Sequence, residues 1–143
     1  MEQNKVQSGQ AKMRPRARLI SLLGDELISD ESVAVVELVK NAYDADASRV
    51  EVIFQNNSTG FPERLIVKDD GHGMNLDTVI GGWFEPGTVL KKQKDSSPGG
   101  RMYQGAKGVG RFAAARLGDS LILETEDSKS KQNVTVLLEW GKF

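Results

Sequence analysis

Apolar residues recur with helical spacing in one long segment, between Ser29 and Asp46. Valine, leucine and alanine occupy most of its positions, which is typical of a helix buried on nearly all sides. Ser29 and Asp30 offer N-cap side chains, and Glu31 puts an anion in the first turn, where the helix macrodipole favours it. The pattern predicts a helix that runs to about Asp46. A shorter helix is expected over residues 17–23.

Four segments are expected to be strands, in two pairs along the chain, and the first of them begins with alternating polar and apolar residues. The first pair covers residues 49–55 and 64–68, and the second covers residues 120–126 and 133–140. A short polar turn connects the members of each pair, so both pairs are expected to be antiparallel hairpins.

The chain between the two hairpins contains two helices and a long irregular segment. A short helix is expected from Leu76 to about Phe84. Residues 85–104 are rich in Gly, Pro, Lys and Ser without periodicity, which is typical of a disordered segment or a functional lid. A glycine-rich segment, residues 105–110, then opens a helix over residues 111–117, with Gly118 as its C-cap.

Composition excludes several kinds of chemistry. The chain has no cysteine, so it forms no disulfide, thiolate zinc site or cysteine nucleophile. Its one histidine, His72, rules out a histidine-rich metal cluster and is expected to be exposed. The net charge of -1 favours neither nucleic acid nor membrane. No apolar stretch is long enough to span a bilayer and no signal peptide is evident, so we expect a cytoplasmic protein without a membrane partner.

The first 18 residues differ from the rest of the chain. They carry five cations against one anion and few apolar side chains, so we expect a basic, flexible arm. The alternative is an arm that contacts a partner subunit or phosphate. Residues 19–143 are expected to form a single domain.

Three polar side chains interrupt the long apolar helix. Glu37, Asn41 and Asp44 are spaced i, i+4 and i+7 and therefore share one face. A buried carboxylate beside a carboxamide is costly unless a partner satisfies both. Either this face meets solvent, or Asn41 offers its oxygen to a hard cation while Glu37 holds a water molecule.

A glycine-containing loop follows the second strand. Asp69 lies at the strand end as a hydrogen-bond acceptor, and Gly71 and Gly73 beyond it let a flat ligand approach the backbone. Met74 and Ile66 could supply apolar walls, or could belong to the core.

The second glycine-rich segment, Gly105 to Gly110, runs directly into a helix. Its backbone N–H groups, the helix N-terminus and the Lys107 side chain could together bind a polyphosphate. The alternative is a glycine hinge.

Taken in this order, the three motifs resemble those of the GHKL ATPases, the family of gyrase B-type topoisomerases, the large heat-shock chaperone, histidine kinases and MutL. ELVKNAYDADA resembles the family's N box, VKDDGHGM its first glycine box and GAKGVGRFAAARLG its second. The resemblance covers residues 19 to about 126, and GTVLKK before the second glycine box is most similar to bacterial MutL- and MORC-like ATPases.

The resemblance implies an α+β fold, a two-layer Bergerat-type sandwich with helices on one face of a mixed, mostly antiparallel sheet. It also implies ATP or ADP bound with Mg²⁺. Glu37 would be the general base and Asn41 the magnesium ligand. Asp69 would accept from the adenine amino group in the loop that contains Gly71, Gly73 and Met74, and Asp44 would support the adenine end through water.

The resemblance further assigns the phosphates and the lid. Residues 85–104 would form the ATP lid, and the phosphate-binding residues would be Gly105, Lys107, Gly108, Val109 and Gly110. Family members continue into a strand with an adenine-contacting threonine and a domain with a catalytic lysine, which we expect beyond Phe143.

Three functions are compatible with these motifs. The first is ATP hydrolysis in which lid closure drives homodimerisation through the arm and the lid, with a DNA or protein client bound by downstream domains. The second is a histidine-kinase-type catalytic domain. The third is a nucleotide-binding interaction module without useful turnover.

Overall fold

The computed structural model describes residues 30–81, 95–105 and 110–139 of the 143-residue chain. Several predictions concern residues outside these ranges. They are the basic arm, the helix at residues 17–23, the first half of the lid and the centre of the second glycine segment.

The long helix is confirmed as α2 (Glu31–Asp44). Its N-cap is Asp30, whose carboxylate accepts a hydrogen bond from the backbone N–H of Val33 at 3.0 Å. The helix ends two residues before the predicted position because Asp46 adopts a left-handed conformation with φ of 61°, which terminates an α-helix.

Two shorter helices follow. They are α3 (Leu76–Val79), which begins after the N-cap Asn75, and α4 (Gly110–Leu117). Helix α4 ends immediately before Gly118, as predicted, although Gly118 is not among the described glycines with positive φ. Gly118 and Asp119 connect α4 to the next strand.

Both predicted hairpins are present. Strands β1 (Val50–Asn56) and β2 (Pro62–Asp69) pair antiparallel, as do β3 (Ser120–Glu126) and β4 (Asn133–Glu139). The fold is therefore α+β. The ladders in the described residues each hold two strands and are antiparallel, so the parallel pairing that a mixed sheet requires is not among them.

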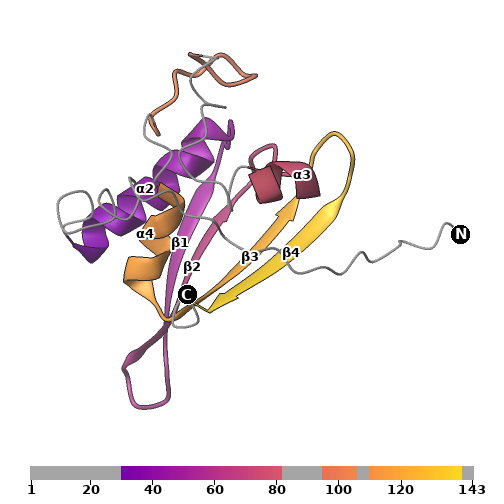
Figure 1. Cartoon of the computed structure of the whole chain (residues 1–143). Helices are drawn as coiled ribbons and strands as arrows, with labels where there is room; N and C mark the ends of the chain where they lie inside the picture. The colour runs from indigo at the N-terminus through magenta and orange to yellow at the C-terminus, as the bar shows by residue number, and fades with distance from the viewer. Residues whose placement is uncertain (1–29, 82–94, 106–109, 140–143) are drawn as a thin grey trace, which may run out of the picture.

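Helices α2 and α4 lie side by side, and α3 lies at one end of the β3–β4 hairpin (Figure 1). Ala34 of α2 and Ala113 of α4 are fully buried against each other, with Leu117 beside them. Small side chains at this contact let the two helix backbones approach closely.

A second apolar cluster joins α3 to the β3–β4 hairpin. Its buried members are Val79, Val134 and Leu138, and the partly buried side chains around them are Met74, Leu76, Leu121, Leu123 and Val136. Buried and exposed residues alternate along β3 and β4, so the two strands share one buried face. This face packs against α3, and the opposite face of the hairpin is exposed.

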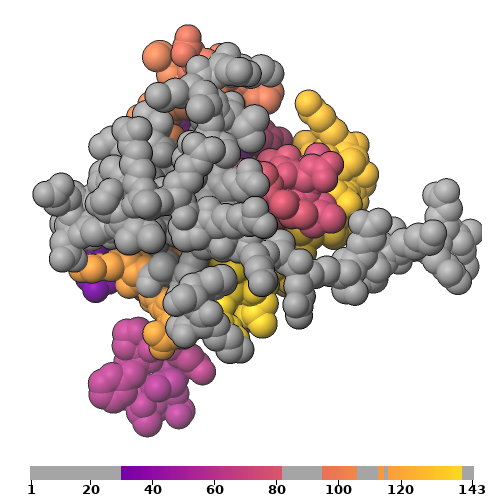
Figure 2. All heavy atoms as spheres, in the orientation of Figure 1, coloured from indigo at the N-terminus to yellow at the C-terminus, as the bar shows by residue number. Residues whose placement is uncertain are grey.

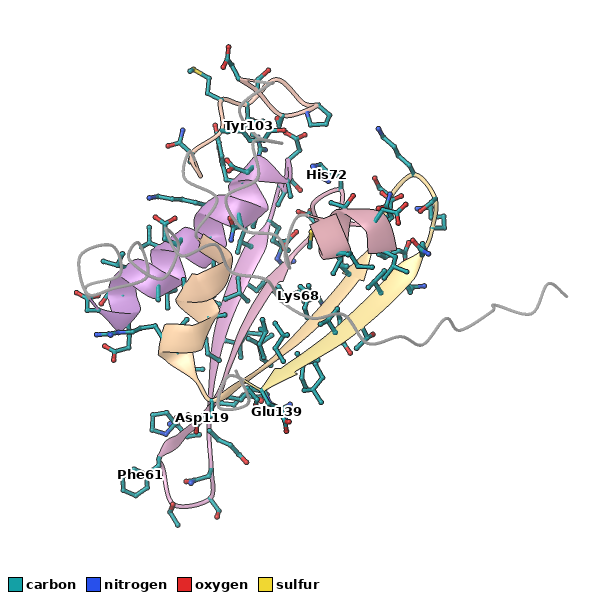
Figure 3. The ribbon with its side chains drawn as sticks, viewed as in Figure 1. Phe61, Lys68, His72, Tyr103, Asp119 and Glu139 are labelled. Carbon is teal, nitrogen blue, oxygen red and sulfur yellow. The ribbon has the colours of Figure 1, made fainter. Side chains whose placement is uncertain are left out.

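The turn of the β1–β2 hairpin projects from the body of the molecule (Figure 2). Asn57 stabilises the turn, since its side-chain oxygen accepts from the backbone N–H groups of Thr59 and Phe61. Phe61 follows this turn (Figure 3) and is 69% exposed, as is Phe54. No helix in the described part of the chain is long and apolar enough to cross a membrane.

Candidate functional site

Helix α2 carries three of the predicted site residues. The Glu37 side chain is 21% exposed, and its Oε1 accepts from the Lys40 ammonium at 2.7 Å. Asn41, one turn after Glu37, is half-buried. No hydrogen bond joins its carboxamide to another residue in the described ranges. The partnership of Glu37 with Lys40 was not predicted, although their i, i+3 spacing is visible in the sequence.

The first glycine loop folds back on its own carboxylate. Asp69 is exposed, and its Oδ1 accepts from the Gly71 N–H at 2.9 Å. A side chain at Gly71 would come within 2.7 Å of the Ala45 carbonyl oxygen. Gly73 has φ of 64°, and a Cβ there would lie 1.8 Å from the Glu126 carbonyl oxygen. Close packing within the chain therefore requires both glycines.

His72 joins this loop to two other elements. Its backbone N–H donates to the Ala45 carbonyl at 2.9 Å, and its carbonyl accepts from the Ser128 N–H at 2.9 Å. The predicted exposure of His72 is wrong: the residue is half-buried, and its Nδ1 lies 2.9 Å from the Gly73 carbonyl oxygen. These contacts place the loop between the end of α2 and the β3–β4 turn, as the label in Figure 3 shows.

Met74 packs in the core beside Val79. Its backbone N–H donates to the Thr125 hydroxyl at 2.9 Å, which fixes the loop to strand β3. Of the two alternatives that the sequence left open for Met74, the structure shows the core position.

Asp70, the residue after Asp69, accepts hydrogen bonds within the fold that the sequence did not predict. Asp70 accepts from the Ser48 N–H at 2.7 Å, the Ser48 hydroxyl at 2.5 Å and the Arg49 N–H at 2.8 Å. These donors, the Ser48 hydroxyl first, lower the pKa of Asp70 below its ordinary value. Asp70 thereby fixes the start of β1 beside the end of β2.

Asp44 joins α2 to the second glycine segment. The side chain is buried, at 5% exposure. Its Oδ1 accepts from the Gln104 N–H at 2.8 Å and its Oδ2 from the Gly105 N–H at 3.0 Å. Since Ala45 contacts the first glycine loop, parts of all three motifs meet at the C-terminal end of α2.

The described half of the predicted lid is also bound to this helix end. Asp46 Oδ1 accepts from the Ser97 hydroxyl at 2.5 Å, and Oδ2 accepts from the Gly99 N–H at 2.8 Å. These bonds, the Ser97 hydroxyl first, lower the pKa of Asp46. Residues 95–105 form a hydrogen-bonded turn in which the Ser97 N–H donates to the Arg101 carbonyl at 2.8 Å.

Arg101 supplies the positive charge that the last turn of α2 lacks. Its Nη1 donates to the Ala47 carbonyl at 2.7 Å and to the Tyr43 carbonyl at 3.3 Å. The guanidinium carbon lies 4.8 Å from the centre of the Tyr43 ring, a cation–π distance. A cation beside the carbonyls at a helix C-terminus is stabilising. Figure 3 shows the neighbouring Tyr103 beyond the same end of α2.

The remaining phosphate candidates are only partly described. Gly110 is the first residue of α4. Lys107, Gly108 and Val109 lie outside the described residues, so their assignment to the phosphates stays a prediction.

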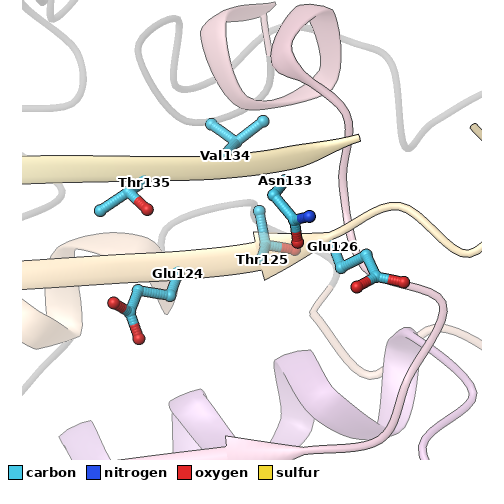
Figure 4. Close-up of a pocket in the computed structure, with 6 residues that line it drawn as sticks. All are labelled: Glu124, Thr125, Glu126, Asn133, Val134 and Thr135. Carbon is cyan, nitrogen blue, oxygen red and sulfur yellow. The ribbon is translucent and has the colours of Figure 1, made fainter. Parts of the chain in front are cut away.

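An open hollow of about 360 Å³ lies elsewhere, on the β3–β4 hairpin (Figure 4). Two of its lining residues, Glu124 and Glu126, are exposed carboxylates. Negative charge there would repel a triphosphate, and no predicted site residue lines this hollow. We therefore do not assign it to nucleotide.

The side chains proposed for the site can offer a metal only oxygen ligands. In the described ranges, no three His, Cys, Asp or Glu side chains cluster as a metal site. Mg²⁺ usually takes one or two protein oxygens and completes its shell with water and substrate phosphate. The Asn41 carboxamide fits such a minimal set, with ligand phosphates as the other donors.

The chain is similar in sequence to known proteins. Residues 28–142 match the family model described as histidine kinase-, DNA gyrase B-, and HSP90-like ATPase. The chain is also 33% identical over 69 residues to the DNA mismatch repair protein MutL of Paramagnetospirillum magneticum. That match spans 48% of this chain and 11% of the MutL protein. Because the family model covers most of the chain, the protein belongs to the family of histidine kinase-, DNA gyrase B- and HSP90-like ATPases.

Proposed function

We propose that this chain binds ATP with Mg²⁺ at the C-terminal end of α2 and hydrolyses it. The observation that carries the proposal is the meeting of the three motifs there, through Asp44 and Gly105 on one side and Ala45 and His72 on the other. A nucleotide requires an adenine acceptor, a metal ligand and a phosphate-binding loop at a single site. The family match supports the same conclusion.

Each proposed role follows from the chemistry of its side chain. Asp69 is exposed and accepts the adenine amino group, while Asn41 contributes an amide oxygen to Mg²⁺. Bound Mg²⁺ neutralises charge on the phosphates during transfer. The glycine segment from Gly105 to Gly110 supplies backbone N–H donors and the charge of Lys107.

Glu37 is proposed as the general base. It lies one turn before Asn41, so a water molecule at its carboxylate would be close to a phosphate whose metal is held by Asn41. The Lys40 ammonium on Oε1 orients the carboxylate. A carboxylate in this position favours water as the phosphoryl acceptor, and hydrolysis is therefore preferred over transfer to a histidine.

The consequences for a larger assembly are also part of the proposal. Nucleotide would close the lid of residues 85–104 and drive homodimerisation through the lid and the basic arm. A DNA or protein client would bind elsewhere. Of these consequences, the similarity to a DNA mismatch repair protein supports only DNA as the client.

The kinetic test is Glu37→Ala, assayed for phosphate release and for ATP binding. Loss of a general base lowers the rate by about 10²–10⁴-fold, while ATP affinity should change little. Asn41→Ala should instead lose the magnesium-dependent part of binding. Glu31→Ala, an exposed carboxylate on the same helix, is the matched control and should keep the wild-type rate.

The outcomes distinguish the three candidate functions. Wild-type hydrolysis by Glu37→Ala would contradict the hydrolase mechanism. ATP binding without turnover by the wild-type chain would favour the interaction module. Phosphate transfer to a histidine-containing protein would favour the kinase-type domain.

A further inference from the structure

Both ends of the second glycine segment are attached to the same helix. At its start, the Gly105 N–H donates to Asp44 of α2. At its end, α4 begins with Gly110 and packs on α2 through Ala113 and Ala34. Helix α2 therefore supports both ends of the segment proposed to bind phosphate, in addition to carrying Glu37 and Asn41.

The Asp44 contact requires a carboxylate. Two of its donors are backbone N–H groups of consecutive residues, Gln104 and Gly105, and each bonds a different oxygen of Asp44. Asparagine has one acceptor oxygen and would direct its amide group at the other donor. Because both hydrogen bonds are partly buried, solvent would compensate the unsatisfied N–H only in part.

The turn that precedes Gly105 is attached to the same helix end independently. Asp46 binds Ser97 and Gly99, and a Cβ at Gly99 would lie only 2.6 Å from the Asp46 carboxylate. Arg101 donates to the Ala47 carbonyl. Residues 95–105 therefore reach Gly105 as a hydrogen-bonded unit on α2, which limits where the glycine segment can begin.

We propose that Asp44 is a positioning residue for the phosphate side of the site and acts through the Gly105 backbone. The inference rests on the proposed ATP binding and differs from the sequence-based role of Asp44 at the adenine end. Asp44 lies three residues after Asn41, so its bond to Gly105 fixes the phosphate-binding backbone relative to the metal ligand. Such preorganisation improves binding of the group that the loop contacts.

The test compares Asp44→Asn with the wild-type chain for binding of ATP–Mg²⁺ and of AMP. AMP retains adenine and ribose but lacks the β- and γ-phosphates. Loss of a hydrogen bond to a charged group should weaken ATP by about tenfold and AMP by no more than about twofold. Amide exchange at Gln104 and Gly105 should accelerate in the variant, a change specific to this contact.

Asp127→Asn is the matched control. Asp127 accepts the N–H and hydroxyl of Ser130 in the β3–β4 turn, so the variant removes a comparable carboxylate remote from α2. It should change neither affinity. If Asp44→Asn does not fold, Asp44→Glu serves in its place, since glutamate keeps both acceptor oxygens but moves them by one methylene, and the same selective loss of ATP is expected.

If Asp44→Asn weakened the binding of ATP and AMP equally, the inference would be overturned. That result would favour the role of Asp44 at the adenine end that the sequence implied. Unchanged affinity for both would overturn it too. Absence of ATP binding by the wild-type chain would instead contradict the proposed function, so the two failures are distinguishable.

Discussion

At the scale of single residues, adjacent carboxylates have different tasks. Asp69 is exposed beside the first glycine loop, whereas Asp70 accepts three hydrogen bonds from Ser48 and Arg49. The sequence predicted a chemical role for Asp69 because a motif contains it. It could not predict the role of Asp70, since the donors lie more than twenty residues earlier and become neighbours only when β1 and β2 pair.

Three aspartates that accept hydrogen bonds in the fold should make the protein less stable in acid. Hydrogen bonds lower the pKa of Asp46, Asp70 and Asp127 in the folded state. The unfolded chain therefore binds more protons as pH falls, so the stabilisation is complete above the ordinary Asp pKa and is lost as pH falls through the lowered values. Thermal unfolding followed by circular dichroism should show the melting temperature falling below about pH 4.

The control for this prediction is Asp70→Asn. This variant lacks one of the shifted carboxylates, so its melting temperature should be lower at neutral pH but should fall less steeply in acid. An acid dependence identical to that of the wild type would show that Asp70 does not contribute to it.

At the scale of elements, local sequence signals are sufficient to predict the helices and hairpins. The N-cap Asp30 and the apolar run predict α2, and strand-like segments on either side of a polar turn predict both hairpins. The docking of residues 95–105 on α2 could not be predicted, because it depends on backbone donors and on Asp44 and Asp46, which are about fifty to sixty residues away. The segment was accordingly expected to lack structure of its own.

The α2–α4 contact predicts a strong effect of side-chain size. Ala34 is fully buried against Ala113, whereas Val36 on the same helix is 51% exposed. Overpacking the contact with Ala34→Leu should lower the free energy of unfolding by about 1–3 kcal/mol. Denaturant titration measures this change, and Val36→Leu is the control that should leave stability nearly unchanged. Equal stability of the two variants would contradict the close packing of α2 and α4.

At the scale of the whole molecule, α2 is the element on which the candidate site is assembled. It contacts the first glycine loop through Ala45, the second through Asp44 and helix α4 through Ala34. The α3 and β3–β4 cluster is a separate core that fixes the first loop through Met74 and Gly73. This division explains why one helix carries the metal and base candidates while a different core supports the proposed adenine loop.

Calorimetric titration with ATP–Mg²⁺ and GTP–Mg²⁺ can establish whether the chain has a single adenine-nucleotide site at the end of α2. Asp69→Asn keeps an oxygen for the Gly71 N–H but presents an amide to the adenine amino group. The wild-type chain should bind ATP more tightly than GTP. Asp69→Asn should lose about 1.5–3 kcal/mol of ATP binding free energy with little change for GTP. The structural control Asp70→Asn should keep the wild-type preference for ATP. Absence of ATP binding by the wild-type chain, or equal loss of ATP and GTP binding in Asp69→Asn, would contradict an adenine-nucleotide site at this position.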